Sequence, residues 1–456
     1  MLILTQSQQR SFGMTSYVTK KTPGNTDWFE MDRFGMFIHF GLYAMPARQE
    51  WIKTFENIPE EKYDKYFKHF NPDMLDAKKW AKMAKAAGMK YAVLTTKHHE
   101  GFCLFDSKFT DYKSTNTPFG RDIVREYVDA FRAEGLKIGF YYSLIDWHHP
   151  EFPIDVLHPR KFDDDAVEQD RGRDMKKYAE YMRNQVTELL TNYGEISIMW
   201  YDFSYDKYNG CGTYMDWMQH DGGKGAKEWE AEELIALTRR LQPGIIIDNR
   251  TGLEADLWTP EQFQPTKWLT HPQTGELVTW EACQTFSGSW GYHRDEMTWK
   301  SPKMLIELLV NTVSLGGNLL MNVGPDARGN FDSRAQKALE VYENWMKYNG
   351  RSIYGCTMAE PNFKAPEGTR LTQSVDSKRL YIHLKEYPFA FLEMEDLADK
   401  IEYAQFLHDG SEIIYTCNST GHFSGEGQTF KDNMVFFRLP PIKPDVEIPV
   451  IEVFLK

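Results

Sequence analysis

Short apolar runs that alternate with amphipathic stretches dominate residues 28–350 of this 456-residue chain. Runs of strand length separated by helices of roughly 10 to 20 residues are typical of βαβ units with a parallel sheet. The predicted strands are Gly35–Gly41, Tyr91–Lys97, Lys137–Ser143, Ile196–Asp202, Gly244–Arg250, Val278–Thr285 and Gly317–Gly324. This many units in one stretch favour a (β/α)8-like, TIM-type barrel, which can be irregular, over an open sheet. No strand is followed by a GxGxxG or GKS/T loop, which argues against dinucleotide and P-loop nucleotide sites.

The pattern changes at about Thr357 to short alternating runs separated by glycine and proline turns, with no long helix between them. Such runs predict a small antiparallel domain, and a β-sandwich fits best. We therefore divide the chain into an N-terminal extension (1–27), a catalytic barrel (28–356) and a C-terminal β-sandwich (357–456).

Charge and cysteine content exclude several classes of protein. The net charge is −13, and lysine and arginine form no long cluster, which argues against nucleic acid and anionic membranes as partners. The five cysteines lack CxxC spacing, so neither a disulfide framework nor a zinc site is expected. No apolar run is long enough for a signal peptide or a membrane span. We expect a cytoplasmic protein, or a secreted one if a leader has been removed; the sequence leaves open whether it forms a homo-oligomer.

Polar and aromatic residues gather where the predicted strands end. Asp202 closes its strand two residues after Trp200, so both side chains should point to the same face. Other strand ends carry His39, His98–His99, Tyr142, Arg250 and Glu281. In barrel enzymes the reacting groups lie at the carboxyl ends of the strands, so these residues predict a common active site.

Two hydrolytic mechanisms could use such residues. A pair of carboxylates could supply a nucleophile, Asp202, and a proton donor, either Glu261 or Glu281. Alternatively, His98–His99 and His148–His149 could hold a metal ion, but neither HxH nor HExxH occurs, which makes this mechanism the weaker one.

Several motifs, in this order along the chain, resemble those of the α-L-fucosidases of glycoside hydrolase family 29. They are Phe37-Ile-His-Phe-Gly41, Lys97-His-His-Glu-Gly-Phe102, Met199-Trp-Tyr-Asp202, Thr259-Pro-Glu261, Trp280-Glu-Ala-Cys283, Ser289-Trp-Gly-Tyr292 and Gly316 to Pro325. The resemblance implies exo-hydrolysis of terminal α-L-fucose from glycans or glycosides, with retention through a covalent fucosyl-enzyme and without metal or cofactor. Competing hypotheses are a glycosidase or transglycosylase of other specificity, and a non-catalytic fucose-binding protein on the same scaffold.

The resemblance also implies roles for individual residues. Asp202 matches the family nucleophile; Glu261 is the preferred acid/base, and Glu281 is the runner-up. The residues that match the family's sugar pocket are His39, Glu50, Trp51, His98, His99, Tyr142, Trp200, Arg250 and Trp290.

The mechanism sets further expectations. Retention requires the two carboxyl groups to lie roughly 5–5.5 Å apart. The nucleophile should have a low pKa, with Arg250 or the histidines supplying the positive charge that keeps Asp202 ionised. The segment 205–225 has no family role that we can assign, and the C-terminal domain is expected to support the fold rather than to bind carbohydrate.

Overall fold

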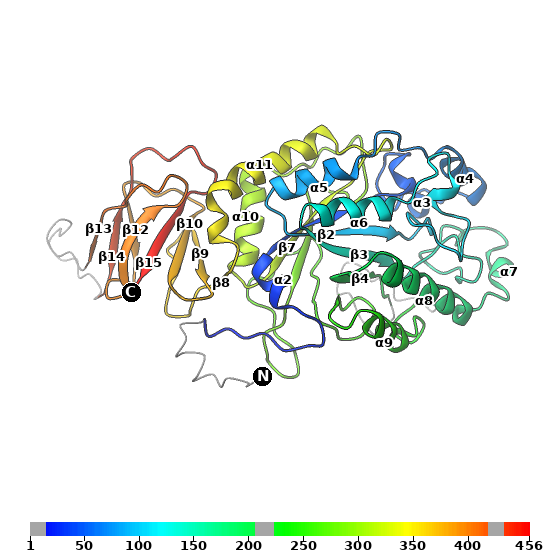
Figure 1. Cartoon of the computed structure of the whole chain (residues 1–456), viewed down its shortest axis with the longest axis horizontal. Helices are drawn as coiled ribbons and strands as arrows, with labels where there is room; N and C mark the ends of the chain where they lie inside the picture. The colour runs from blue at the N-terminus through cyan, green and yellow to red at the C-terminus, as the bar shows by residue number, and fades with distance from the viewer. Residues whose placement is uncertain (1–14, 206–222, 418–432) are drawn as a thin grey trace.

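A computed structural model describes residues 15–205, 223–417 and 433–456 (Figure 1). Residues 1–14 of the expected N-terminal extension, and most of the segment 205–225, lie outside the described part of the chain. A parallel sheet in the order β5-β4-β3-β2-β1-β7-β6 forms the larger part of the molecule. Its strands are β1 (Phe34–Ile38), β2 (Tyr91–Lys97), β3 (Lys137–Ser143), β4 (Ile198–Asp202), β5 (Ile246–Ile247), β6 (Glu281–Thr285) and β7 (Asn318–Val323).

An irregular segment, residues 257–261, lies between the two edge strands of this sheet. Leu257 pairs in parallel with Asp248, directly after β5, while Trp258 pairs with Trp280 and Glu261 with Cys283 on the β6 side. The segment thereby takes the place of an eighth strand, and the curled sheet is a (β/α)8-like barrel. The sequence predicted the irregularity only as a long loop, because 257–261 has no continuous apolar run.

Helices cover the outside of the barrel. They are α2 (Asp27–Asp32), α3 (Ile52–Phe55), α4 (Glu60–His69), α5 (Ala77–Ala86), α6 (Ile123–Ala133), α7 (Ala166–Asp170), α8 (Met175–Asn192), α9 (Ala231–Leu241), α10 (Pro302–Val313) and α11 (Ser333–Asn349). Side chains of Asp76, Asp122, Asp174, Ser301 and Asp332 accept hydrogen bonds from free backbone N–H groups at helix starts. These N-caps stabilise the first turns of the longer helices.

Neighbouring residues of each strand belong to two different cores. Phe37, Tyr141 and Trp200 pack inside the barrel, whereas Met36, Tyr142 and Tyr201 pack outward in the layer shared with the helices. This alternation follows from the pleat of a strand. It decides which of two adjacent side chains can reach the active site.

The C-terminal part folds as two antiparallel sheets, one in the order β12-β15-β10-β9-β8 and one in the order β11-β14-β13. Apolar side chains from both sheets, such as Ile382, Ile451, Val435 and Phe437, form a separate core between them, as in a β-sandwich. The strands are β8 (Cys356–Met358), β9 (Thr369–Ser374), β10 (Arg379–Leu384), β11 (Phe391–Met394), β12 (Ile401–Phe406), β13 (Tyr415–Cys417), β14 (Val435–Arg438) and β15 (Val450–Leu455). The sequence pattern did not reveal β8, β9 and β11, which are short or rich in threonine.

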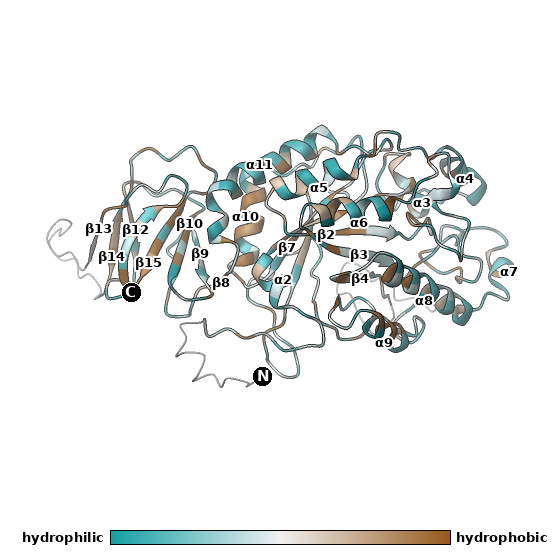
Figure 2. Ribbon diagram, in the orientation of Figure 1, coloured by the Kyte–Doolittle hydropathy of each residue, from teal (hydrophilic) through white to brown (hydrophobic). Residues whose placement is uncertain are grey.

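α10 lies between the barrel and the sandwich, in contact with β7 on one side and with β8 and β9 on the other. Its residues are accordingly mostly hydrophobic, as the brown ribbon in Figure 2 shows. Its apolar residues pack against both parts, while Lys303, Glu307 and Asn311, four residues apart, form a partly exposed polar stripe.

The arrows of β2 and β3 in Figure 1 point toward the end of the molecule where α3, α4 and α7 lie, and the sandwich lies at the other end. The carboxyl ends of the barrel strands therefore open away from the C-terminal sheets. Among the helices of the described residues, none is long and apolar enough to cross a lipid bilayer.

Candidate active site

Two carboxylates share one arginine at the carboxyl end of the barrel. Nη1 of Arg250 lies 3.0 Å from Oδ1 of Asp202 and 2.7 Å from Oε2 of Glu261. Since both oxygens contact the same nitrogen, they lie less than about 6 Å apart, a limit compatible with the carboxyl separation of ~5–5.5 Å in retaining glycosidases. Arg250 is itself held in place, because its Nε donates to Oγ1 of Thr259 at 2.9 Å.

Asp202 is the last residue of β4 and is almost fully buried. Its Oδ2 accepts a 2.7 Å hydrogen bond from the hydroxyl of Tyr141, and Nε2 of His99 lies 4.0 Å from the same oxygen. Phe203, the next residue, adopts a left-handed backbone with φ of 88°, which is uncommon for a bulky side chain. Such a strained turn directly after a buried carboxylate is typical of functional sites.

Burial raises the pKa of Asp202 to about 6, although Arg250 and the Tyr141 hydrogen bond oppose the shift. We had expected a lowered pKa; instead, the loss of solvent outweighs the favourable charge of the arginine. The negative charge of Glu261 raises the pKa further. Asp202 is thus ionised at neutral pH and protonated in moderate acid.

The three predicted histidines lie together in this pocket. The ring centroids of His98 and His99 are 4.0 Å apart, and those of His39 and His98 are 5.7 Å apart. Burial lowers the pKa of His39 to about 3 and the pKa values of His98 and His99 well below their usual range. The imidazoles are therefore neutral hydrogen-bonding groups, and Arg250, rather than the histidines, supplies the positive charge next to Asp202.

Individual hydrogen bonds orient two of these rings. Nδ1 of His39 lies 2.6 Å from Oδ1 of Asn322 on β7, and Nδ1 of His99 lies 2.7 Å from the hydroxyl of Ser143. Nδ1 of His98 is buried and has no hydrogen-bond partner within the described residues. A buried nitrogen in this state can bind a hydroxyl group of a ligand.

Glu50 and Trp290 close another side of the pocket. Oε2 of Glu50 accepts a 2.8 Å hydrogen bond from the backbone N–H of Gly291, and the Trp290 ring packs 5.1 Å from that of His39. Burial raises the pKa of Glu50 to about 7; the Gly291 bond lowers it, and the negative charge of Glu261 adds to the rise. Glu50 therefore lies near Glu261 and carries a proton for part of the time at neutral pH.

Aromatic rings line the remaining walls. Trp200 packs beneath Arg250, whose guanidinium lies 4.5 Å from the ring. Trp51 contacts His99 at 4.8 Å and Phe203 at 5.2 Å between ring centroids. The structure thus brings Trp51 and Trp200 to the pocket, as the sequence predicted.

Tyr142 does not reach the pocket, which corrects the sequence-based assignment. Its side chain belongs to the outward-facing core, where its hydroxyl donates to Gln185 of α8 at 2.7 Å. Tyr141 lies at Asp202 instead. The prediction missed the correct tyrosine by one residue, and one residue along a strand reverses the face to which a side chain points.

Glu281 lies at the amino end of its strand, away from the carboxyl ends that form the site. It is the first residue of β6, fully buried, and its carboxylate accepts a hydrogen bond from Tyr91 inside the barrel. Burial raises its pKa to about 8. Glu261, by contrast, has a side chain that is 42% exposed and contacts Arg250. These positions favour Glu261 over Glu281 as the partner of Asp202.

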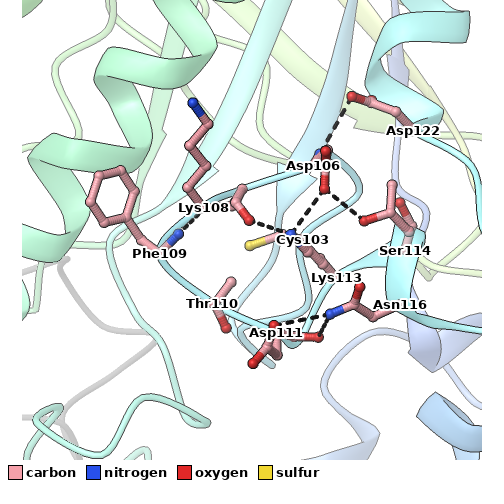
Figure 3. Close-up of polar contacts among 12 residues, drawn as sticks. Cys103, Asp106, Lys108, Phe109, Thr110, Asp111, Lys113, Ser114, Asn116 and Asp122 are labelled. Atoms are coloured by element: carbon pink, nitrogen blue, oxygen red, sulfur yellow. Dashed lines mark hydrogen bonds and ion pairs between the residues drawn. The ribbon is translucent and has the colours of Figure 1, made fainter.

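Buried polar contacts hold the loop that carries His98 and His99. Nζ of Lys97 lies 3.1 Å from Oδ2 of Asp146, and both side chains are almost completely buried. The loop then continues into a turn that bonds mainly to itself (Figure 3): Asp106 pairs with Lys113 at 2.9 Å, and Asn116 donates to the carbonyl of Asp111 at 3.0 Å. The histidines are therefore preorganised by the fold.

Sequence reasoning missed Tyr141, Ser143 and Asn322. Each lies on a predicted strand, but the pattern of a strand does not state which of its two faces meets the pocket. Within the described residues, no group of three or more histidine, cysteine, aspartate or glutamate side chains is arranged to hold a metal ion.

Residues 2–351 match the family described as α-L-fucosidase. The chain belongs to the α-L-fucosidases of glycoside hydrolase family 29. Members of this family are glycoside hydrolases, and the reaction of this chain is retaining exo-hydrolysis of α-L-fucosides. Fucose-containing molecules are accordingly its substrates.

Relatives and solved structures support the same family. Human plasma α-L-fucosidase is 30% identical over 360 residues, which cover 72% of this chain and 68% of that protein. α-L-Fucosidase isoenzyme 1 from Paenibacillus thiaminolyticus is 44% identical with a TM-score of 0.83, over 94% of this chain and 98% of that one. A family 29 enzyme from Bacteroides thetaiotaomicron, solved as a trapped covalent intermediate with 2-fluoro-fucosyl fluoride, is 28% identical with a TM-score of 0.76, over 97% of this chain and 99% of that one.

Proposed function

We propose that Asp202 is the nucleophile and Glu261 the acid/base of this α-L-fucosidase. The observation that carries the proposal is the contact of both carboxylates with one nitrogen of Arg250, at 3.0 and 2.7 Å. Two carboxylates this close to each other suit a double displacement, because no water molecule has to fit between the nucleophile and the sugar.

In the first step, the Asp202 carboxylate attacks the anomeric carbon of fucose. The bond to the leaving oxygen breaks while protonated Glu261 donates its proton to that oxygen. The products are the free leaving group and a fucosyl ester on Asp202. Arg250 favours this step by keeping Asp202 ionised, since the guanidinium lowers the pKa that burial raises.

In the second step, water attacks the ester, and Glu261, now a carboxylate, removes a proton from the water. Asp202 is uncharged while it is esterified, so Arg250 has only Glu261 as a charged partner. The arginine thereby stabilises the base in the step that needs a base, and the nucleophile in the step that needs a nucleophile. A single guanidinium that contacts both groups can serve both steps without a change of its own charge.

The pocket has the chemical groups that a fucose ring requires. Neutral imidazoles of His39 and His98, together with the carboxyl of Glu50, can exchange hydrogen bonds with sugar hydroxyls. Trp200 and Trp290 provide apolar surfaces for the ring face and the methyl group. Burial keeps His39 and His98 neutral, so they would meet the sugar as uncharged hydrogen-bonding groups.

Azide rescue tests the two roles. With 4-nitrophenyl α-L-fucoside, Asp202→Gly should lose hydrolysis and, with added azide, form β-fucosyl azide. Glu261→Ala should form α-fucosyl azide, because azide then attacks the intact fucosyl-enzyme. Glu281→Ala is the matched control and should show no rescue.

Near-normal hydrolysis by Asp202→Gly would contradict the nucleophile, and α-fucosyl azide from Glu281→Ala would transfer the acid/base role to Glu281. A wild-type protein that binds fucose but releases no nitrophenol would indicate a binding protein.

A further inference from the structure

A short aromatic path leads from Asp202 to the protein surface. The ring of His99, 4.0 Å from Asp202, contacts Trp51, and the Trp51 ring stacks on Phe55 with a centroid distance of 5.8 Å and an interplanar angle of 25°. Phe55 is 63% exposed, whereas Trp51 is half-buried and His99 is buried. An exposed ring stacked on a pocket residue presents a flat apolar face just outside the fucose site.

Phe55 belongs to the segment 48–56, which also carries the pocket residues Glu50 and Trp51. The negative charge of Glu261 contributes to the raised pKa of Glu50, after the larger effect of burial. In addition, the backbone of Arg48 forms an antiparallel β-bridge with His293, in the loop that carries Trp290. Since Glu261, as the proposed acid, would protonate the oxygen that joins fucose to its leaving group, we place the leaving group between Glu261 and residues 48–56.

A polar pair lies beside the exposed ring. Nε and Nη2 of Arg48 donate to the two carboxylate oxygens of Glu56 at 2.8 and 2.7 Å, and about half of each side chain is exposed (44% and 45%). An apolar ring next to an exposed guanidinium and carboxylate matches the two kinds of surface that a sugar presents, an apolar ring face and an edge of hydroxyls.

The short helix α3, which ends at Phe55, is held firmly although it is only four residues long. α3 is anchored by the buried ammonium of Lys53, 2.8 Å from Glu60, and by the hydroxyl of Thr54, which donates to the carbonyl of Leu157 at 2.8 Å. Binding on such a preformed surface requires little ordering of the protein.

We propose that Phe55, with the adjacent Arg48–Glu56 pair, binds the sugar from which fucose is released. This inference rests on the proposed function and extends it, because it names Phe55 as a residue that determines which leaving-group sugar is accepted. Phe55 takes no part in the chemical steps.

The test compares substrates with and without a leaving-group sugar. α-L-Fucosyl fluoride has none, whereas a panel of 2-, 3-, 4- and 6-linked fucosyl disaccharides offers one in different orientations. Phe55→Ala should lower kcat/KM for the best disaccharide roughly 10- to 50-fold, from lost apolar contact and stacking, and leave the value for the fluoride within about twofold. Phe55→Trp should retain activity on the disaccharide, and Arg48→Ala should change the order of preference among linkages.

Phe389→Ala is the matched control, because Phe389 is 87% exposed and lies in the sandwich domain. It should leave both substrates unaffected. Equal losses on disaccharide and fluoride in Phe55→Ala, or no loss on either, would overturn the subsite while leaving the proposed function intact. Wild-type hydrolysis of the fluoride but of no disaccharide would also overturn it. Failure of the wild type on every substrate would instead contradict the proposed function.

Discussion

At the scale of single residues, Arg250 has the largest influence on the chemistry. It contacts Asp202 and Glu261 and stacks on Trp200. Burial tends to neutralise the arginine, but the two carboxylates raise its pKa well above the usual value and keep it charged. A lysine ammonium could contact both carboxylates, but it has no planar group with which to cover the indole ring.

The raised pKa of Asp202 predicts the acid side of the pH profile. With a pKa of about 6, kcat/KM of the wild type should fall tenfold per pH unit below that value. Arg250→Met removes the charge that lowers this pKa, so the acid limb should move to higher pH and the maximum should fall by roughly 10²-fold or more. Measurement of kcat/KM for α-L-fucosyl fluoride from pH 4 to 8 checks both effects. An unchanged limb in the variant would show that Arg250 does not control the ionisation of Asp202.

Glu281 should affect stability rather than catalysis. Its pKa is about 8 in the folded protein and near 4.5 when unfolded, so between these pH values the folded state binds the additional proton. Stability therefore falls as pH rises through this window, by about 1.4 kcal/mol per unit from this group. Glu281→Gln should remove that slope, and urea unfolding at pH 5 and pH 8 would measure it. Activity should stay within a few-fold of the wild type; a 10³-fold loss would contradict the structural role.

At the scale of elements, the ends of the strands decide how the site is built. β2 ends at Lys97, and a buried ion pair with Asp146 then fixes the start of the loop that presents His98 and His99. Burial tends to raise the pKa of Asp146, but the charge of Lys97 lowers it below the usual value. The pair therefore stays charged within an apolar surrounding that includes the Tyr142 ring, 4.3 Å from the Lys97 ammonium.

Removal of one partner of this ion pair should reduce the free energy of unfolding more than removal of both charges. Lys97→Met leaves Asp146 buried without its ammonium partner and should reduce the free energy of unfolding by about 3–5 kcal/mol. The double variant Lys97→Met, Asp146→Asn should recover part of that loss. Chemical denaturation of the three proteins measures the difference. Equal stability of the single variant and the wild type would mean that water reaches and solvates the carboxylate.

At the scale of the whole molecule, the barrel and the C-terminal sheets share apolar contacts. Tyr381, Ile448 and Val450 of the sandwich belong to the same core cluster as Trp345 and Met346 of α11. Nε1 of Trp345 also donates to the carbonyl of Glu447 at 2.7 Å. This interface supports the expectation that the C-terminal domain serves the fold.

Removal of residues 357–456 should therefore destabilise the barrel. The shortened chain would expose the buried faces of α10 and α11, and we expect aggregation or an unfolding temperature lower by several degrees. The full chain should unfold in a single calorimetric transition. Two separated transitions, with a stable and active shortened chain, would contradict the shared core.

The sequence by itself indicated the order of the barrel strands, the barrel and the sandwich. These features depend on local patterns, namely apolar runs and polar residues at strand ends, whereas Glu50, Trp51 and Trp290 were assigned only through the family resemblance. It left the choice between Glu261 and Glu281 open, and it assigned Tyr142 where Tyr141 reaches Asp202. Periodicity places both tyrosines on one strand but does not state which face meets the active site.

Only the tertiary structure could place these side chains, because their positions depend on contacts between distant segments. Arg250 bridges Asp202 and Glu261 since an irregular segment, residues 257–261, completes the barrel next to β5. The pKa of Asp202 is raised rather than lowered because burial by the surrounding strands outweighs one favourable charge. Burial and electrostatic coupling are sums over neighbours, and the neighbours are known only once the chain has folded.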